Sequence, residues 1–400
     1  MPANFEVVIV GAGPAGLAAA SAAVERSRRV LLIDDNPAPG GQIWRGEGRQ
    51  PPRGVETWLE TQVLGPLRPG LLMADRAGVP AQISYEKLIL ATGARERFLP
   101  FPGWTLPSVM GAGGLQALVK GGLAIEGKRV VVAGTGPLLL AVAAYLAKRN
   151  ARILLVAEQA PRQRVLRFTA NLWRQPAKLA QAFSMGRYLA LKYRTGLWPV
   201  SAHGNGKLEE ILLSNSRRLA CDYLSCGFGL VPNSELAALL GCRIATGEVL
   251  VDEFQRTTRE RIWCAGEPTG IGGAELSIIE GRIAGYAATG DRHSATSLFT
   301  ARMRASRFPR EMDSAFSLRP ELRRLVHPGT IICRCEDVRF SQLTSHTTWR
   351  AMKLHTRCGM GPCQGRVCGP AVEFLLGCAP EGARPPLYPA TVSQLALDRQ

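Results

Sequence analysis

The hydrophobic pattern at the start of the chain alternates short apolar runs with one alanine-rich segment. It predicts a strand over 5–10, a glycine turn over 11–16, a helix over 17–25 and a second strand over 29–33. Elements in this order form a βαβ unit, whose two strands are parallel. The first part of the chain is therefore expected to build a parallel sheet with the glycine turn at its edge.

The same order of elements recurs in the middle of the chain. It predicts a strand over 130–133, a turn over 134–137, a helix over 138–149 and a strand over 151–156. A third fragment, with a strand over 261–266 and a helix over 272–288, is interpreted as the chain returning to complete the first domain. Together these patterns predict an α/β protein with two Rossmann-like dinucleotide-binding domains, one inserted in the other.

Two changes in sequence character mark further boundaries. Residues 291–328 are basic and interrupted by prolines, which is typical of a linker. From residue 329 cysteine becomes frequent, because five of the ten cysteines lie between 333 and 368. The expected domains are a first dinucleotide domain over 1–112 and 247–292, an inserted domain over 113–246, a linker over 293–328, a small helical C-terminal domain over 329–385 and a tail over 386–400.

The charge and the apolar runs limit the classes of partner. Lysine and arginine number 49 against 32 acidic residues, and the net charge of +17 favours anionic partners. The basic residues are scattered and not interleaved with aromatic side chains, so nucleic-acid binding is not expected. Glycines interrupt the apolar stretch over 7–24, and no other stretch approaches about twenty apolar residues. We expect no integral membrane segment and a cytoplasmic location, and leave peripheral membrane association open.

The first glycine turn has the fingerprint of a dinucleotide site. Its first glycine allows the tight turn, its second the approach of a pyrophosphate and its third close helix–strand packing, while the helix N-terminus attracts phosphate. An acidic residue at the end of the second strand would accept hydrogen bonds from the ribose. The residues predicted to bind are Gly11, Gly13, Pro14, Ala15, Gly16 and Asp34, with Asp35 as the spare acid.

Three later segments favour FAD over NAD as that dinucleotide. The pair Gly40-Gly41, followed by Gln42, places bare backbone shortly after the acidic residue. One predicted strand ends in Ala91-Thr92-Gly93, and another ends in Gly266-Glu267, whose carboxylate is suited to a ribityl chain. All four elements in this order resemble the glutathione-reductase-like flavoproteins, which contain two dinucleotide domains.

The second glycine turn is less complete. Gly134 and Gly136 keep the first two glycines, but Leu139 replaces the third, which moves the helix outward and weakens the site. Glu158 at the end of the next strand retains a ribose acceptor. The turn alone leaves three ligand states open: NAD(H), another adenine nucleotide, or a retained fold without a ligand.

The C-terminal cysteines predict an iron–sulfur cluster. Cys333 and Cys335 form one close pair, and Cys363 and Cys368 form another. Four thiolates satisfy a [2Fe–2S] cluster, whereas structural zinc sites usually separate paired cysteines by two or more residues. Zinc and ligand-free thiols are the competing interpretations, and Cys358 is an alternative to one member of the second pair. The predicted fold is thus α/β with two Rossmann-like domains and a small C-terminal helical iron–sulfur domain.

Several longer motifs resemble one bacterial family, the alpha (A) subunits of opine oxidases, hydroxyproline and proline dehydrogenases and hydrogen cyanide synthases. The last of these motifs, Thr-Arg-Cys-Gly-Met-Gly-Pro-Cys-Gln-Gly-Arg-Val-Cys-Gly, is the most specific, and its domain is similar to bacterioferritin-associated ferredoxin. The motifs that carry the resemblance lie at 40–45, 98–107, 265–276 and 356–369. Trp44 departs from the tyrosine common in the family, and Leu139 departs from the nucleotide fingerprint.

The resemblance implies a heteromeric complex. A beta subunit with its own flavin would oxidise the C–N bond of an amino acid or opine, this chain would pass the electrons on through FAD and the cluster, and a small ferredoxin-like gamma subunit is sometimes present. The implied cluster ligands are Cys333, Cys335, Cys363 and Cys368, which favours Cys368 over Cys358. No acid–base constellation for a substrate is evident, so we predict no catalytic residue in this chain.

Two other functions compete with this hypothesis. A stand-alone NAD(P)H-dependent flavoprotein reductase would use the second βαβ unit for its nicotinamide nucleotide. A non-enzymatic iron-handling or scaffold module would use the cysteine domain alone. Flavin and iron content of the purified chain discriminates among the three.

Overall fold

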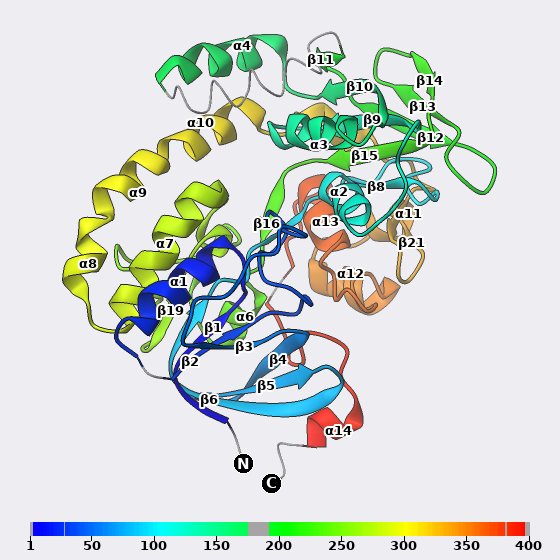
Figure 1. Cartoon of the computed structure of the whole chain (residues 1–400). Coiled ribbons are helices and arrows are strands. Elements are labelled where there is room, and N and C mark those ends of the chain that lie inside the picture. Colours follow the sequence, from blue (N-terminus) through cyan, green and yellow to red (C-terminus); the bar gives the residue numbers. More distant parts are fainter. Residues whose placement is uncertain (1–2, 28, 175–191, 381, 397–400) are drawn as a thin grey trace. The chain divides into compact units, whose positions relative to one another are not determined.

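The protein is described by a computed structural model (Figure 1). It describes residues 3–27, 29–174, 192–380 and 382–396, so residues 175–191 of the expected inserted domain, residue 381 and residues 397–400 of the expected tail lie outside it. Across these four ranges, no helix is both long enough and apolar enough to cross a membrane.

The chain folds into two compact units. The first unit contains residues 1–95, 231–309 and 382–400, and the second contains residues 96–230 and 310–381. The chain leaves the first unit within strand β7 (Ala94–Glu96) and returns to it within strand β16 (Leu230–Pro232). These limits differ from the expected domain limits, which stay predictions.

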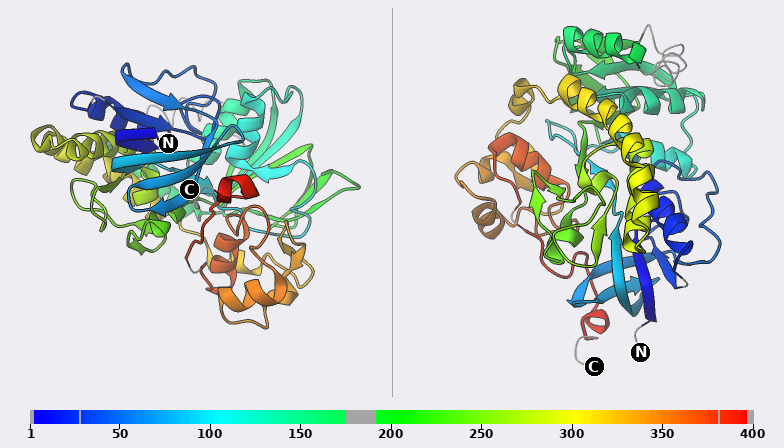
Figure 2. Two further views of the ribbon diagram at one scale, coloured as in Figure 1. Left: turned by 90° about the horizontal axis from the view of Figure 1, so that it is seen from below. Right: turned by 90° about the vertical axis from the view of Figure 1, so that its left-hand side faces the viewer.

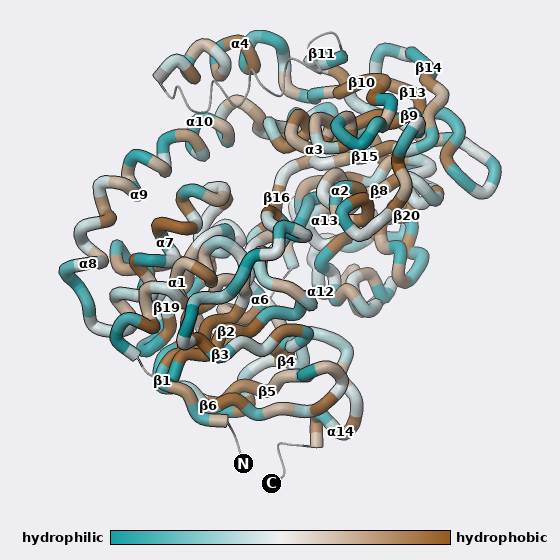
Figure 3. Tube along the Cα trace, in the orientation of Figure 1, coloured by the Kyte–Doolittle hydropathy of each residue, from teal (hydrophilic) through white to brown (hydrophobic). Residues whose placement is uncertain are grey.

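A seven-stranded sheet is the centre of the first unit. Its parallel part places β3-β2-β1-β6 side by side, β19 pairs with the end of β6, and β5 and β4 continue as an antiparallel extension. β2 is buried along its whole length and is strongly hydrophobic (Figure 3). The strands are β1 (Ala3–Val10), β2 (Val30–Ile33), β3 (Val55–Trp58), β4 (Thr61–Arg68), β5 (Leu71–Arg76), β6 (Val79–Leu90) and β19 (Ile262–Cys264).

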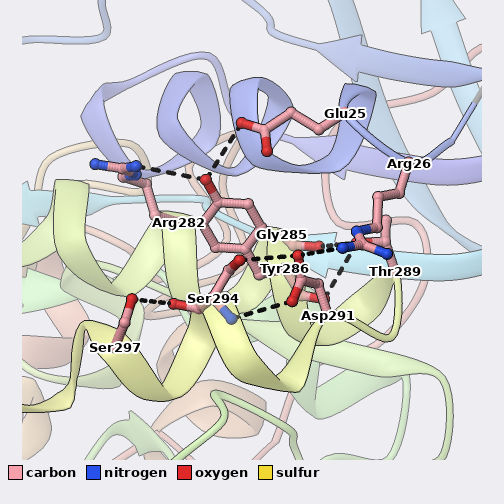
Figure 4. Close-up of polar contacts among 9 residues, drawn as sticks. All are labelled: Glu25, Arg26, Arg282, Gly285, Tyr286, Thr289, Asp291, Ser294 and Ser297. Atoms are coloured by element: carbon pink, nitrogen blue, oxygen red, sulfur yellow. Dashed lines mark hydrogen bonds and ion pairs between the residues drawn. The ribbon is translucent and has the colours of Figure 1, made fainter.

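Helices α1 (Pro14–Val24) and α7 (Gly273–Ala288) pack closely on one another. They come together because α7 has glycine at two contact positions, where a Cβ on Gly281 or Gly285 would collide with backbone atoms of α1. Tyr286 of α7 donates to Glu25 just after α1, at 3.2 Å (Figure 4). The predicted return of the chain to the first sheet is therefore confirmed by this helix pair and by β19.

A five-stranded parallel sheet is the centre of the second unit, in the order β11-β10-β9-β15-β8. Helices α2 (Ala112–Lys120) and α3 (Leu138–Ala147) contribute buried side chains to its core. The predicted second Rossmann-like fold is therefore confirmed. Its strands are β8 (Val109–Gly111), β9 (Arg129–Gly134), β10 (Arg152–Glu158), β11 (Tyr193–Thr195) and β15 (Tyr223–Gly227), and a separate antiparallel sheet contains β12 (Pro199–His203), β13 (Glu210–Leu213) and β14 (Arg218–Ala220).

The segment expected as a linker is largely helical. Its helices α8 (Arg292–Ser297), α9 (Phe299–Ala305) and α10 (Arg307–Phe316) appear in yellow in Figures 1 and 2. The apolar pattern did not predict α8 and α9 because α8 buries only Ala295 and α9 buries no residue. Other short elements are α4 (Arg162–Asn171), η1 (Leu172–Arg174), α6 (Glu235–Leu239), β17 (Ile244–Ala245), β18 (Glu248–Val249), η2 (Glu267–Thr269) and η3 (Pro320–Arg324).

The cysteine-rich region is small and mainly helical, as predicted, and has its own core around Trp349 and Met352. The residues after it return to the first unit, where the Leu387 N–H donates to the Leu64 carbonyl of β4 at 2.8 Å. The elements of these regions are β20 (Ile331–Cys333), β21 (Val338–Arg339), α11 (Phe340–Leu343), α12 (Trp349–Thr356), α13 (Cys368–Leu376) and α14 (Val392–Leu395).

Candidate cofactor sites

The first glycine turn lies where β1 ends and α1 begins, and Pro14 starts the helix, a position at which its missing N–H costs no hydrogen bond. Gly11 has a φ of 107°, and a Cβ there would collide with the Ala91 carbonyl. A Cβ on Gly16 would collide with the Gly11 carbonyl. The turn is therefore confined to glycine at its first and third motif positions for steric reasons.

The later segments predicted to share the first site meet at this turn. The Gly40 N–H donates to the Ala12 carbonyl at 2.8 Å, and Gly41 packs against Gly13. The Ala91 N–H donates to the Val10 carbonyl at 2.8 Å. Gly266 has a φ of 79° and lies against Ala15. Three later segments thus converge on one glycine turn.

The acidic residue after β2 is held inward. Asp34 is buried, and its carboxylate accepts hydrogen bonds from the Ala12 N–H and from the Asn36 N–H, the latter at 2.9 Å. Asp35 is exposed, so Asp34 is the better placed of the two predicted acids. Gln42 is also exposed.

Thr92 and Gly93 are positioned by a residue that the sequence did not single out. The Thr92 hydroxyl donates to the Asn233 carbonyl at 2.6 Å, and the Asn233 N–H donates to the Gly93 carbonyl at 3.0 Å. Asn233 lies 141 positions away, so no local signal marks it.

Two buried carboxyl groups follow β19. Glu267 Oε1 accepts the Gly273 N–H at 2.7 Å, whereas its buried Oε2 has no hydrogen-bond partner within the described ranges. Glu280, which sequence reasoning missed, accepts the Gly266 N–H at 3.0 Å and fixes that turn. Burial raises the pKa of Glu280 to about 7 and also raises the pKa of Glu267. Glu280 could have been identified from the sequence as a charged residue within the apolar face of α7.

These features fit FAD at the first site. A pyrophosphate can approach backbone that carries no Cβ, and the turn and Gly41 supply such backbone. The orphan Glu267 Oε2 is an acceptor in need of a donor, and the hydroxyl groups of a ribityl chain are donors.

The second glycine turn has the same backbone geometry. Gly134 has a φ of 135°, and a Cβ there would collide with the Gly227 carbonyl. Leu139, in place of the third glycine, is fully buried in the core between the helices and the sheet. Glu158 is fully buried, and its two oxygens accept the Gly136 N–H at 2.7 Å and the Ala160 N–H at 2.8 Å. Burial raises the pKa of Glu158 to about 7.

The end of α10 and the residues that follow it contact this second turn. The Thr135 hydroxyl donates to the Phe316 carbonyl at 2.9 Å, and the Phe316 ring faces Gly136. Gln159 Nε2 donates to the Ser317 carbonyl at 3.2 Å. The glycine turn is thus contacted by side-chain and backbone atoms of the same unit.

The C-terminal cysteines gather in two groups. The sulfur atoms of Cys333, Cys358 and Cys368 lie within 4.8 Å of one another and are buried. Cys335 Sγ lies 3.8 Å from Cys363 Sγ. The predicted ligands are therefore divided between the two groups, with Cys333 and Cys368 in one and Cys335 and Cys363 in the other, and the structure adds Cys358, to which the sequence gave second place.

The chemistry of this cysteine set fits a metal cluster. Thiolates are the ligands of iron–sulfur clusters, and the neighbouring thiols lower the pKa of Cys333 well below its usual value through hydrogen bonds. Gly361 makes room for Cys335, because a Cβ at 361 would collide with the Cys335 Cβ. Cys221 and Cys226, by contrast, are fully buried in an apolar core, where they serve as small packing residues.

Comparisons with known proteins match most of the chain. A family model for pyridine nucleotide-disulphide oxidoreductases matches residues 5–283. The A subunit of opine oxidase from Agrobacterium tumefaciens (strain Ach5) is 30% identical over 435 residues, covering 93% of this chain and 85% of the relative. The HcnB subunit of hydrogen cyanide synthase from Pseudomonas aeruginosa is 30% identical over 423 residues, covering 91% of each.

A solved structure has the same fold over nearly the whole chain. The crystal structure of L-proline dehydrogenase from P. horikoshii superposes with a TM-score of 0.70 at 20% identity, covering 99% of this chain and 80% of that one. A thioredoxin reductase from T. acidophilum superposes with a TM-score of 0.53 at 19% identity, covering 75% of this chain and 99% of that one. At these identities the likeness shows a shared fold.

Proposed function

Because this chain belongs to the pyridine nucleotide-disulphide oxidoreductase family, and within it to the group of the opine oxidase A subunits and the HcnB subunits of hydrogen cyanide synthase, we propose that it is the electron-transferring subunit of a heteromeric amino-acid dehydrogenase. Membership makes it an FAD-binding oxidoreductase. In the proposed complex, a beta flavoprotein subunit oxidises the C–N bond of hydroxyproline, proline or an opine. This chain passes the electrons to an acceptor, and a small gamma subunit is an optional further partner.

The observation that carries the proposal is the gathering of cysteine sulfurs in a chain that also has a complete FAD cradle. Five thiols lie in two groups within one small domain. A stand-alone reductase needs no such thiol set, and an iron-handling scaffold needs no cradle of four converging segments. The two features together favour a protein that moves electrons.

Each feature has a defined part in the proposal. Gly11, Gly13, Gly16, Asp34 and Gly41 would hold FAD through backbone and carboxylate contacts, with Gln42 beside them. FAD supplies a carrier that accepts an electron pair and releases single electrons. Glu267 would accept a hydrogen bond through its free Oε2, while Glu280 keeps the Gly266 turn in place. Cys333, Cys335, Cys363 and Cys368 would hold a [2Fe–2S] cluster.

The second glycine turn argues against the nicotinamide-dependent alternative. A reductase would bind NAD(P)H there, beside Gly134, Gly136 and Glu158. Phe316 faces Gly136, the glycine at which a pyrophosphate would approach the backbone. This arrangement favours a partner flavoprotein over NAD(P)H as the source of electrons.

The test begins with the chain purified anaerobically. We expect flavin and iron in the same preparation, with visible absorption from both. Cys335→Ser should remove most of the iron and leave the flavin, because Cys335 lies 3.8 Å from Cys363 in the sulfur group. Cys378→Ser is the matched control, because Cys378 lies in the same domain but its sulfur contacts the Thr347 carbonyl at 3.2 Å. Iron that persists unchanged in Cys335→Ser contradicts the cluster assignment.

The division of labour is tested by coexpression with a beta subunit encoded beside this chain. Dye-linked oxidation of hydroxyproline, proline or an opine should require both subunits. Full oxidation of an amino acid by this chain alone contradicts the proposal, as does rapid bleaching of its flavin by NADH.

A further inference from the structure

We propose that residues 315–319 are a built-in occupant of the second glycine turn, and that they exclude nicotinamide dinucleotides from the second Rossmann-like fold. The contacts below all lie within the second unit. The inference goes beyond the proposed function, which depends on the first fold and on the cysteines.

The first argument concerns the place of the pyrophosphate. In a dinucleotide fold, the second glycine of the turn leaves space for the pyrophosphate to approach the backbone. Here that glycine is Gly136, and the Phe316 ring takes the space, because a Cβ built on Gly136 would lie 4.0 Å from Phe316 Cγ. The ring also packs against Phe168 of α4, at 5.0 Å between centroids in an edge-on arrangement.

The second argument concerns the polar groups around the turn. Thr135 Oγ1 donates to the Phe316 carbonyl at 2.9 Å, and Gln159 Nε2 donates to Thr135 Oγ1 at 2.9 Å and to the Ser317 carbonyl at 3.2 Å. Gln159 Oε1 accepts the Arg319 N–H at 3.1 Å. Gln159 is fully buried, so it has no water to exchange for these partners. The segment presents carbonyl oxygens to the donors that phosphate and ribose oxygens would otherwise use.

The third argument concerns the charged groups at the ribose end. Glu158 accepts backbone N–H groups with both oxygens, as Asp34 does in the first fold, so this acid does not itself distinguish the two folds. The segment reaches the ribose end through Arg164 of α4, which donates to the Ser317 hydroxyl at 2.8 Å. The segment therefore extends from the glycine turn to the ribose end of the fold. A dinucleotide would have to displace it along this whole length.

The experiment uses NADH and ATP as probes of the full chain. Binding is measured by calorimetry with wild type and with the double variant Phe316→Ala, Ser317→Gly, which removes the ring over Gly136 and the hydroxyl beside Arg164. We expect no saturable binding to wild type up to about 1 mM, the upper end of usual Michaelis constants. The double variant should bind at least one probe at least about tenfold more tightly.

Phe299→Ala is the matched control. Phe299 belongs to the same helical segment and also makes an edge-on ring pair, 5.2 Å from Phe254, but it lies in the first unit. This variant should behave as wild type toward both probes. Flavin and iron content, measured in parallel, report on the proposed function separately, so loss of either in wild type leaves this inference standing.

Two outcomes would overturn the inference. Saturable binding of NADH to wild type would show that the segment does not exclude the dinucleotide, and a folded double variant that binds neither probe would show that something else closes the site. If the double variant does not fold, hydrogen exchange of wild type with and without NADH decides. Unchanged exchange over 134–140 supports the inference, and protection there refutes it.

Discussion

The two Rossmann-like folds begin with the same strand, glycine turn and helix, but different atoms surround the two turns. Around the first turn lie Gly40, Gly41 and Gly266, which contribute backbone alone. Around the second lie Leu139 and Phe316, which contribute large apolar side chains. The acids that follow the second strands do not differ in this way, because both oxygens of Asp34 and both oxygens of Glu158 accept backbone N–H groups. A glycine motif therefore specifies the turn, and the neighbouring segments decide whether a ligand fits.

The largest expected effect comes from placing alanine at the first glycine of each turn. Gly11→Ala and Gly134→Ala should each destabilise the fold by more than about 4 kcal/mol, because a positive φ and a collision with a carbonyl act together. Only Gly11→Ala should abolish flavin binding. Thermal midpoints and the ratio of flavin to protein are the measurements.

Gly78→Ala is the control for backbone strain without collision. Gly78 has a φ of 86° and no atom near its Cβ position, so about 1 kcal/mol is expected. Equal loss of flavin in Gly134→Ala and Gly11→Ala would contradict the proposal that flavin binds only at the first turn.

Leu139→Ala should have the next largest effect. Removing a fully buried leucine side chain leaves a cavity, and we expect a loss of about 4 kcal/mol. The same variant should still bind no NADH, because Phe316 continues to face Gly136. Tight NADH binding in calorimetry would identify Leu139, instead of the covering segment, as the obstacle.

Glu280→Gln addresses the pH dependence of the first fold. Burial raises the pKa of Glu280 to about 7, so the folded chain holds this proton more tightly than the unfolded chain does. The stabilisation is complete below about pH 4.5 and is lost as the pH rises through 7, by up to about 3 kcal/mol. Denaturant unfolding at several pH values should show this slope in wild type and a flatter profile in Glu280→Gln. An unchanged slope would contradict the assignment.

Arg164→Ala should have the smallest effect. Its hydrogen bond to the Ser317 hydroxyl is exposed, so we expect less than about 1 kcal/mol of destabilisation. Hydrogen exchange over 313–320 should increase slightly, while flavin content stays constant. A large loss of stability would mean that the covering segment depends on this one cation.

The predictable parts of this molecule are those that local sequence encodes. Apolar runs beside Gly11 and Gly134 predicted both βαβ units. The spacing of the C-terminal cysteines predicted a sulfur site, and the structure places these cysteines in two sulfur groups. Requirements of this kind can be recognised in the sequence within a few residues of the site.

The parts that escaped prediction depend on distant partners. Phe316 meets Thr135 across 181 positions, and Asn233 meets Thr92 across 141, so neither has a local signature. Cys358 joined the sulfur group because its loop folds back beside Cys368, which spacing alone did not specify. The helices over 292–305 bury too few side chains to produce an apolar period.

The hydrogen bond from Leu387 to Leu64 has a consequence for how the cysteine domain is joined to the rest. Residues 382–396 belong to the first unit. Along the chain, the cysteine domain is therefore both preceded and followed by segments of the first unit. A protease cut inside the domain would leave both fragments anchored to one sheet. Deleting everything after residue 381 would strip a backbone partner from β4 and expose a sheet edge, the kind of surface that promotes aggregation.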